Sequence, residues 1–125
     1  MVAMNPAVQG AMLDSMVREV TALNREKGWY DEDRSVGDMV ALLHAEVSEM
    51  LEAYRTNKFE SWEVESTPGF PASPVKPEGF KVEAADVFIR LLDMCARYDI
   101  DLWVEFRKKM DFNWTRPYRH GGKTL

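Results

Sequence analysis

The stretches EVSE at residues 46–49 and EAAD at residues 83–86 decide how this chain is interpreted. Each places two carboxylates three residues apart, and side chains at that spacing are neighbours on one helix face. Both stretches lie in sequence with helical periodicity, so two facing helices would bring four carboxylates together. Like charges at such a place repel one another and raise their pKa values unless a counter-charge is present. A hard divalent cation such as Mg²⁺, which prefers oxygen ligands, is the natural counter-charge.

The hydrophobic pattern predicts an all-α fold in a single domain over residues 1–125, with four helices. The first covers residues 6–27. The second runs from Ser35, where Asp38 completes a capping box, to about residue 57. The third begins near residue 79 or 80 and ends at about 98, and the fourth covers roughly 100–112 with Asp99 or Asp101 as its cap. The apolar positions expected to face inward are Val8, Met12, Met16, Val20, Leu23, Met39, Leu42, Leu43, Val47, Met50, Tyr54, Phe80, Val87, Phe88, Leu91, Met94, Cys95, Tyr98, Leu102, Trp103 and Phe106.

The acidic residues lie in or beside two of these apolar stripes. Glu46 falls within the stripe of the second helix and Glu49 lies at its edge, whereas Glu52 points to the opposite side. Glu83 lies at the margin of the third helix's stripe, with Asp86 further round. A carboxylate on a buried face is costly unless it is paired or binds a metal. One acidic pair at this spacing is common on a solvated helix face, so the coincidence of two pairs is what favours a site.

The remaining segments are not predicted to be helical. Residues 58–79 contain four prolines and form a Pro-rich connection, with a weak strand pattern over residues 61–67. A connection of this length is typical of functional lids and of mobile loops. Residues 113–125 are predicted to form an extended basic tail.

Charge is unevenly distributed along the chain. The net charge is −5, yet residues 107–125 carry six basic side chains against Asp111 alone. An acidic body with a basic tail suits a site that holds metal on acids and phosphate on bases, and it argues against a nucleic-acid partner. Cys95 is the single cysteine, which excludes an intrachain disulfide. With no leader pattern and no apolar run of membrane length, we expect a cytoplasmic protein without a membrane partner.

Several side chains are candidates for contact with a substrate. The tail combines cations and hydrogen-bond donors that suit a polyphosphate, namely Lys109, Asn113, Arg116, Arg119 and Lys123. The alternative is a basic terminus without a ligand. Trp29, in the connection after the first helix, is a candidate wall for a nucleobase. His44 is expected at the surface and Cys95 in the core.

Three stretches resemble the MazG-like all-α nucleoside triphosphate pyrophosphohydrolases, in the compact single-domain branch found in phages and bacteria. They are LLHAEVSEMLEAYR, KPEGFKVEAADVFIRLLDMCARYDIDL and KMDFNWTRPYRHGGKTL. The resemblance covers roughly residues 35–57 and 77–125. The 33 residues between Glu49 and Glu83 exceed the family's usual gap, so we expect the Pro-rich insert to reshape the base pocket.

The resemblance implies a four-helix core completed by homo-oligomerisation as a dimer or tetramer, and Mg²⁺-dependent hydrolysis of a (d)NTP to the monophosphate and pyrophosphate. It implies that Glu46, Glu49, Glu83 and Asp86 bind Mg²⁺, with Mn²⁺ as a substitute. Glu46 and Glu49 are the expected catalytic residues, Glu49 accepting the proton of the attacking water. The tail residues would contact phosphates, reaching into a neighbouring subunit's site.

A non-catalytic helical oligomer that binds nucleotide or a protein partner is the competing interpretation. It should not need Mg²⁺, whereas the enzyme should. A scaffold whose basic tail contacts nucleic acid is a further alternative, and steeply salt-dependent binding would support it.

Overall fold

A computed structural model describes residues 5–65, 69 and 74–125 of the chain. The helices are α1 (Pro6–Glu26), α2 (Val36–Arg55), α3 (Phe80–Arg97), α4 (Leu102–Thr115) and α5 (Arg119–Gly122), and the strands are β1 (Trp62–Glu65) and β2 (Val75–Glu78). The structure is mostly helical, as the sequence predicts. None of the helices in the described ranges is long and apolar enough to cross a membrane.

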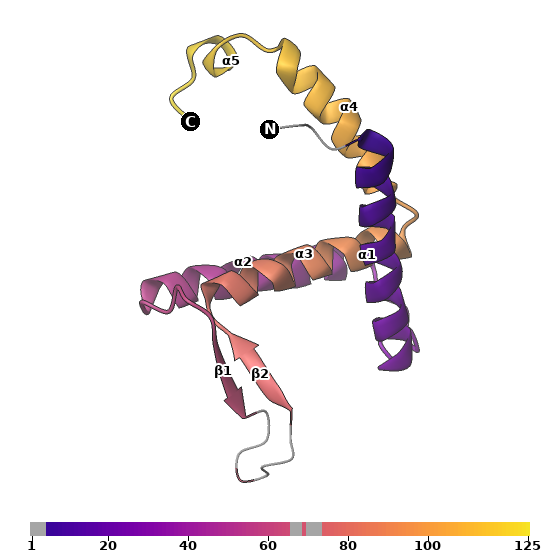
Figure 1. Cartoon of the computed structure of the whole chain (residues 1–125), viewed down its shortest axis with the longest axis vertical. Helices are drawn as coiled ribbons and strands as arrows, with labels where there is room; N and C mark the ends of the chain where they lie inside the picture. The colour runs from indigo at the N-terminus through magenta and orange to yellow at the C-terminus, as the bar shows by residue number, and fades with distance from the viewer. Residues whose placement is uncertain (1–4, 66–68, 70–73) are drawn as a thin grey trace.

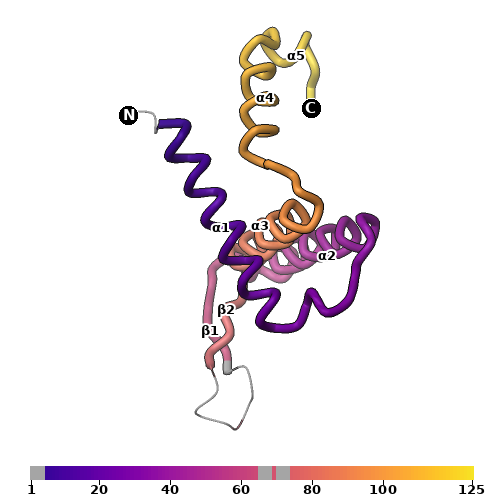
Figure 2. The backbone as a smooth tube through the Cα atoms, turned by 90° about the vertical axis from the view of Figure 1, so that its right-hand side faces the viewer, coloured from indigo at the N-terminus to yellow at the C-terminus, as the bar shows by residue number. Residues whose placement is uncertain are grey.

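Helices α2 and α3 lie side by side and run in opposite directions, with the β1–β2 hairpin joining them at one end (Figure 1). Helix α1 crosses α3 near the other end of this pair, and α4 begins beside α1 (Figures 1 and 2). The two acidic stretches therefore lie on the two helices that make the most extensive contact in the chain.

Side chains at the helix starts explain where the helices begin. The Ser35 hydroxyl accepts a hydrogen bond from the Asp38 amide (3.1 Å), and the Asp38 carboxylate accepts one from the Ser35 amide (3.3 Å). This is the predicted capping box. Asp101, rather than Asp99, caps α4 by accepting from the Val104 amide (3.1 Å). The first two helices end one or two residues earlier than predicted, which is the usual uncertainty of helix ends.

The Pro-rich connection contains a hairpin that the sequence did not reveal in full. Strand β1 pairs with β2 in antiparallel register, with Trp62 opposite Glu78. The weak strand prediction is confirmed for residues 62–65, and its last two positions, 66 and 67, lie outside the described residues. Pro77 is compatible with β2 because both strands of a two-stranded sheet are edges. Residues 58–79 connect α2 and α3 as predicted, and β2 (Val75–Glu78) is the part of the connection that the sequence did not predict.

Gly79 joins the hairpin to α3 in a conformation that requires glycine. Its φ is +118°, and a Cβ there would lie 2.3 Å from the Glu60 carbonyl oxygen. Other residue types rarely adopt this backbone conformation. Gly79 therefore sets the direction in which α3, with Glu83 in its first turn, leaves the hairpin.

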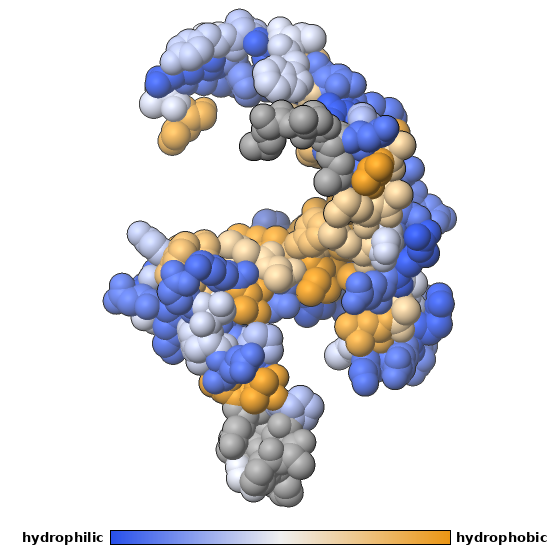
Figure 3. All heavy atoms as spheres, in the orientation of Figure 1, coloured by the Kyte–Doolittle hydropathy of each residue, from blue (hydrophilic) through white to orange (hydrophobic). Residues whose placement is uncertain are grey.

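The buried core is small. Its apolar members are Val20, Met39, Leu92 and Cys95, of which Leu92 was not assigned to a stripe from sequence. Many predicted inward positions are exposed instead, including Val8, Met12, Met16 and Leu23 on α1 and Val47 and Tyr54 on α2. Figure 3 shows apolar residues gathered along α2 and α3 and where α1 crosses them. Phe106 is 46 % exposed, so its predicted inward position was wrong.

The C-terminal region differs from the predicted extended tail. Helix α4 continues to Thr115, so Asn113 is helical, and a short turn, α5, follows. Arg116, which precedes Pro117, is extended (ψ 145°) because proline disfavours a helical residue before it. Among the described residues, α4 makes its main helix contact with α1 and then leads away from the α2–α3 pair (Figures 1 and 2). One chain therefore does not close a four-helix bundle by itself.

Candidate functional site

Three of the predicted ligands converge on one point between α2 and α3. Glu46, Glu49 and Glu83 each offer a carboxylate oxygen, and these atoms lie within 4.8 Å of one another. The antiparallel pairing of α2 and α3 places Glu83, from the first turn of α3, opposite the two glutamates of α2. We call these three residues the glutamate cluster.

Asp86, the fourth predicted ligand, lies beside the glutamate cluster rather than within it. It follows Glu83 by three residues on α3 and lines a hollow of about 320 Å³ together with Glu46 and Glu49. Burial, followed by the negative charge of Glu46, raises the pKa of Asp86. Two cations act in the opposite direction, Arg90 on α3 and Lys76 on β2.

Glu83 has the least favourable surroundings of the cluster. Its Oε2 atom is buried and has no hydrogen-bond partner among the described residues. Its pKa is raised, first by burial, then by the charges of Glu49 and Asp86, by a side-chain hydrogen bond with Glu49 and by the charge of Glu46. A buried acceptor left unpaired is destabilising by about 1–3 kcal/mol. This oxygen therefore fits a position that a cation fills.

The donor set matches hard divalent cations. Carboxylate oxygens are the ligands that Mg²⁺ and Ca²⁺ take in proteins, and Mg²⁺ commonly uses one or two carboxylates and fills its remaining positions with water and phosphate. The glutamate cluster could hold such an ion, and Asp86 lines the adjoining hollow. The alternative is an ordinary acidic surface without an ion.

Arg90 is the cation nearest to the cluster that sequence reasoning did not select. Its Nε donates a hydrogen bond of 2.8 Å to Glu46 Oε1. The Glu46 side chain is 13 % exposed and that of Arg90 is 35 % exposed, so the pair is partly shielded from water. The pairing of Arg90 with Glu46 on α2 depends on tertiary contact, which helical spacing alone does not show.

The other wall of the hollow carries an aromatic ring and polar groups. Trp29, 55 % exposed, lines it with Asn24, Arg34 and Ile89. The Arg34 guanidinium carbon lies 5.2 Å from the centre of the Trp29 ring. The structure therefore places Trp29, the predicted wall for a nucleobase, in the same hollow as three of the four predicted metal ligands.

A buried network fixes the loop that carries Trp29. Asp93 on α3 is 4 % exposed, and its Oδ1 accepts a hydrogen bond of 2.8 Å from the Tyr30 hydroxyl. The Arg97 guanidinium lies over the Tyr30 ring at 4.2 Å and donates to the Trp29 carbonyl oxygen (2.7 Å). Arg97, one helical turn further along α3, also pairs with Asp93 (3.4 Å). Sequence analysis gave Asp93 no role, because Tyr30, which donates to it, lies 63 residues away along the chain.

The predicted phosphate-binding residues of the tail do not lie at this site within one chain. Helices α4 and α5 extend beyond the N-terminal half of α1, away from the glutamate cluster (Figures 1 and 2). Lys109 and Arg116 lie over Phe112, and Arg119 lies over Tyr118. Asn113 Oδ1 is buried without a hydrogen-bond partner in the described ranges, and Lys123 is exposed. Their proposed contact with phosphate requires a second chain.

The family of the chain is not established by similarity. No protein-family model, curated protein or solved structure matches it. Its function must therefore be inferred from the chemistry of the site.

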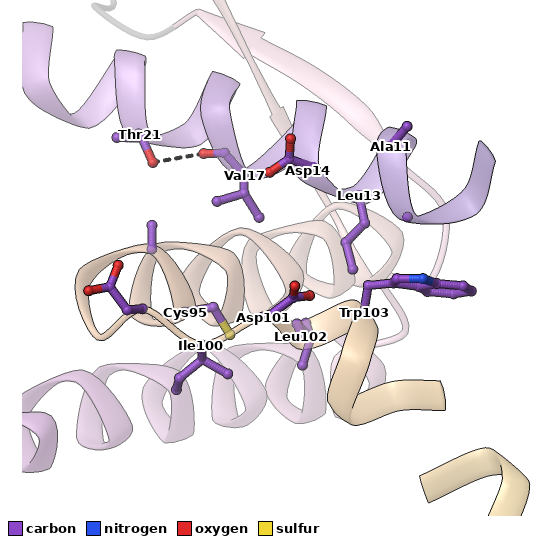
Figure 4. Close-up of a pocket in the computed structure, with 13 residues that line it drawn as sticks. Ala11, Leu13, Asp14, Val17, Thr21, Cys95, Ile100, Asp101, Leu102 and Trp103 are labelled. Atoms are coloured by element: carbon purple, nitrogen blue, oxygen red, sulfur yellow. Dashed lines mark hydrogen bonds between the residues drawn. The ribbon is translucent and has the colours of Figure 1, made fainter. Parts of the chain in front are cut away.

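A larger hollow, of about 680 Å³, lies on another side of the molecule. Figure 4 shows that it is formed by α1, the end of α3 and the beginning of α4, with Leu13, Val17 and Cys95 among its walls. Asp14 and Asp101 lie at this hollow, but Asp101 caps α4 and Asp14 is paired with Arg18. The residues of the glutamate cluster are not among those that line it.

Proposed function

We propose that this protein is a Mg²⁺-dependent nucleoside triphosphate pyrophosphohydrolase that converts a (d)NTP to its monophosphate and pyrophosphate. The observation that supports it most directly is the glutamate cluster, which offers three carboxylate oxygens within 4.8 Å of one another. Glu83 also carries a buried oxygen, Oε2, that has no hydrogen-bond partner among the described residues. The adjoining hollow carries Trp29 and Arg90, which are suited to a base and to a phosphate. The sequence resemblance to MazG-like enzymes points to the same reaction.

Each residue of the site has a distinct part in this proposal. Glu46, Glu49, Glu83 and Asp86 hold the cation, which when bound neutralises phosphate charge and lowers the pKa of a bound water. Glu49 is exposed and lines the hollow, where its carboxylate accepts the proton of the attacking water. Trp29 stacks on the base, and the Asp93–Tyr30 hydrogen bond fixes the loop that presents it.

The test is a pyrophosphate-release assay against the eight common NTPs and dNTPs, with Mg²⁺ and with chelator. Release that requires Mg²⁺ and gives the monophosphate supports the proposal and identifies the preferred base. Glu46→Gln should lose this release. Glu52→Gln is its matched control, because Glu52 is also on α2 but is 64 % exposed and paired with Arg55. No release from any of the eight would contradict the proposed substrate class.

We propose further that the active form is a homo-oligomer, a dimer or a tetramer. The exposed apolar residues of α2, namely Val36, Val40, Val47, Leu51 and Tyr54, recur at helical spacing along one stripe. Those of α1, namely Val8, Met12, Met16 and Leu23, form a second stripe. Contiguous apolar surface of this kind marks interaction sites. A second copy could also bring its basic tail, with Lys109, Asn113, Arg116, Arg119 and Lys123, to the site.

The same stripes favour a second candidate, a non-catalytic helical oligomer that binds nucleotide or a protein partner. The two candidates differ in their use of metal. A pure interaction module would assemble and bind equally well in chelator, whereas the enzyme would lose turnover.

A further inference from the structure

Arg90 occupies an unusual position for a cation next to a metal site. It lines the same hollow as Glu46 and Glu49, and it links Glu46 to α3 through one hydrogen bond of 2.8 Å. Within residues 5–65, 69 and 74–125, Glu46 is the only hydrogen-bond partner of its side chain. A guanidinium has several N–H donors in a planar fork, so most of its donor capacity is free in this arrangement.

The clustered carboxylates of the site require a nearby positive charge. Glu46, Glu49 and Glu83 bring three carboxylate oxygens within 4.8 Å of one another, Asp86 lines the adjoining hollow, and Arg90 donates to Glu46 at 2.8 Å. Arg90 therefore supplies part of the positive charge that a divalent cation would also supply.

A divalent cation and Arg90 would then compete for the same carboxylate. Arg90 donates to Glu46 Oε1, and the Glu46 side chain is 13 % exposed and belongs to the glutamate cluster. A divalent cation bound to Glu46 would compensate the negative charge of the carboxylate and repel the Arg90 guanidinium. The Arg90 side chain is 35 % exposed and lines the hollow, so it has room to turn away from Glu46.

We propose that Arg90 is a stand-in cation: it pairs with Glu46 while the metal is absent and turns to a phosphate oxygen of the substrate once the metal binds. The inference rests on the proposed function for the identity of the substrate, although its first step concerns the metal alone. Arginine suits the second step because its fork binds phosphate through two parallel hydrogen bonds. When Arg90 turns to the phosphate, Glu46 is free to bind the cation, so that the cation and the guanidinium can both contact the substrate.

The test compares Arg90→Met with wild type by calorimetric titration of Mg²⁺ alone and of tripolyphosphate in saturating Mg²⁺. Methionine keeps the length of the side chain and removes its charge. Loss of the competing cation should tighten Mg²⁺ binding about three- to tenfold. Loss of the phosphate contact should weaken tripolyphosphate binding about tenfold or more. Arg90→Lys keeps the charge, so its Mg²⁺ affinity should be close to that of wild type. Its tripolyphosphate affinity should stay below that of wild type, because lysine lacks the guanidinium fork.

Arg55→Met is the matched control, because Arg55 is paired with Glu52 on the surface of α2 and should change neither affinity. Thermal unfolding in chelator establishes that each variant is folded. Unchanged or weaker Mg²⁺ binding by a folded Arg90→Met would overturn the proposal, because it would show that Arg90 only positions Glu46. If wild type bound no Mg²⁺ at all, this inference and the proposed function would both fail. If metal binding behaved as expected but no nucleotide were hydrolysed, the proposed function alone would fail.

Discussion

At the scale of single residues, the site is a set of carboxylates whose charges are only partly compensated. Arg90 pairs with Glu46, and Lys76 acts on Asp86 from a distance, but Glu83 Oε2 is buried without a hydrogen-bond partner among the described residues. The close approach of these carboxylates is unfavourable for the folded state. Such strain is typical of functional sites, where a ligand completes the arrangement.

The raised pKa of Glu83 gives the first prediction, on stability against pH. An acid with a raised pKa in the folded state binds protons more readily folded than unfolded. It therefore favours folding at low pH, and this contribution is lost as the pH rises from the ordinary glutamate value of 4.5 through the raised one. Without metal, Glu83→Gln should melt a few degrees higher than wild type at pH 7 and show little difference near pH 4. Thermal unfolding in chelator checks this. A lower melting temperature for Glu83→Gln at pH 7 would contradict it.

Metal should reverse that order. Added Mg²⁺ compensates the cluster in wild type, so its melting temperature should rise by several degrees at pH 7, whereas Glu83→Gln should gain much less. The same unfolding experiment, repeated across Mg²⁺ concentrations, measures both shifts. Equal gains for the two proteins would show that the ion does not bind at the cluster.

Catalysis gives the third prediction. Asp86→Asn removes a ligand charge with little change in shape, so turnover should fall by about 100-fold or more while the helical circular dichroism is retained. Initial rates with Mg²⁺ at saturating substrate are the measurement. Activity of Asp86→Asn within about threefold of wild type would remove Asp86 from the site.

Sequence reasoning at this scale identified the acids but not their partners. The spacing within EVSE and EAAD fixes which carboxylates share a helix face, and the structure brings Glu46, Glu49 and Glu83 together. Sequence reasoning missed Arg90, Tyr30 and Asp93. Their roles come from contacts between segments that are distant in sequence, which helical periodicity cannot predict.

At the scale of elements, α2 and α3 are the platform of the site, and local chemistry decides where each begins. Ser35 and Asp38 start α2 through a capping box that the sequence shows directly. Gly79 starts α3 through a backbone conformation that the sequence only suggests. Strand β2 was missed because Pro77 argues against a strand unless the strand is an edge, which local sequence does not reveal.

Gly79 gives the prediction at this scale. An alanine there combines a forbidden φ of +118° with a Cβ that would lie 2.3 Å from the Glu60 carbonyl oxygen. Gly79→Ala should therefore lose about 2–4 kcal/mol of unfolding free energy. Gly37→Ala is the control: Gly37 lies in the first turn of α2, where a Cβ would meet only Ser35 Oγ at 3.7 Å. It should be neutral or stabilising. Urea unfolding measures both, and equal stability of the two variants would contradict the role given to Gly79.

At the scale of the whole molecule, the chain has more apolar surface than it covers. Val20, Met39, Leu92 and Cys95 make up its buried apolar core, while α1 and α2 carry exposed stripes. Helical periodicity predicted which positions of these helices are apolar, but not which of them a single chain would bury. That depends on how the helices pack, and α4 leads away from α2 and α3 instead of covering them (Figure 1).

The prediction at this scale concerns assembly. Leu51, 56 % exposed in the α2 stripe, should lie at the interface of the proposed oligomer. Leu51→Lys should weaken self-association by about tenfold or more, because it buries a charge in an apolar contact. Ala41→Lys adds the same charge at an exposed position of α2 outside this stripe and should leave association unchanged. Light scattering after size-exclusion chromatography distinguishes them, and a monomeric wild type at every concentration would contradict the proposed oligomer.

The most direct test of the proposed function follows the phosphorus atoms of the preferred nucleotide by ³¹P NMR, with wild type, Glu46→Gln and the control Glu52→Gln in Mg²⁺. The account predicts that wild type and Glu52→Gln form the nucleoside monophosphate and pyrophosphate together, and that Glu46→Gln forms neither. Release of single phosphates, or equal hydrolysis by Glu46→Gln, would contradict it.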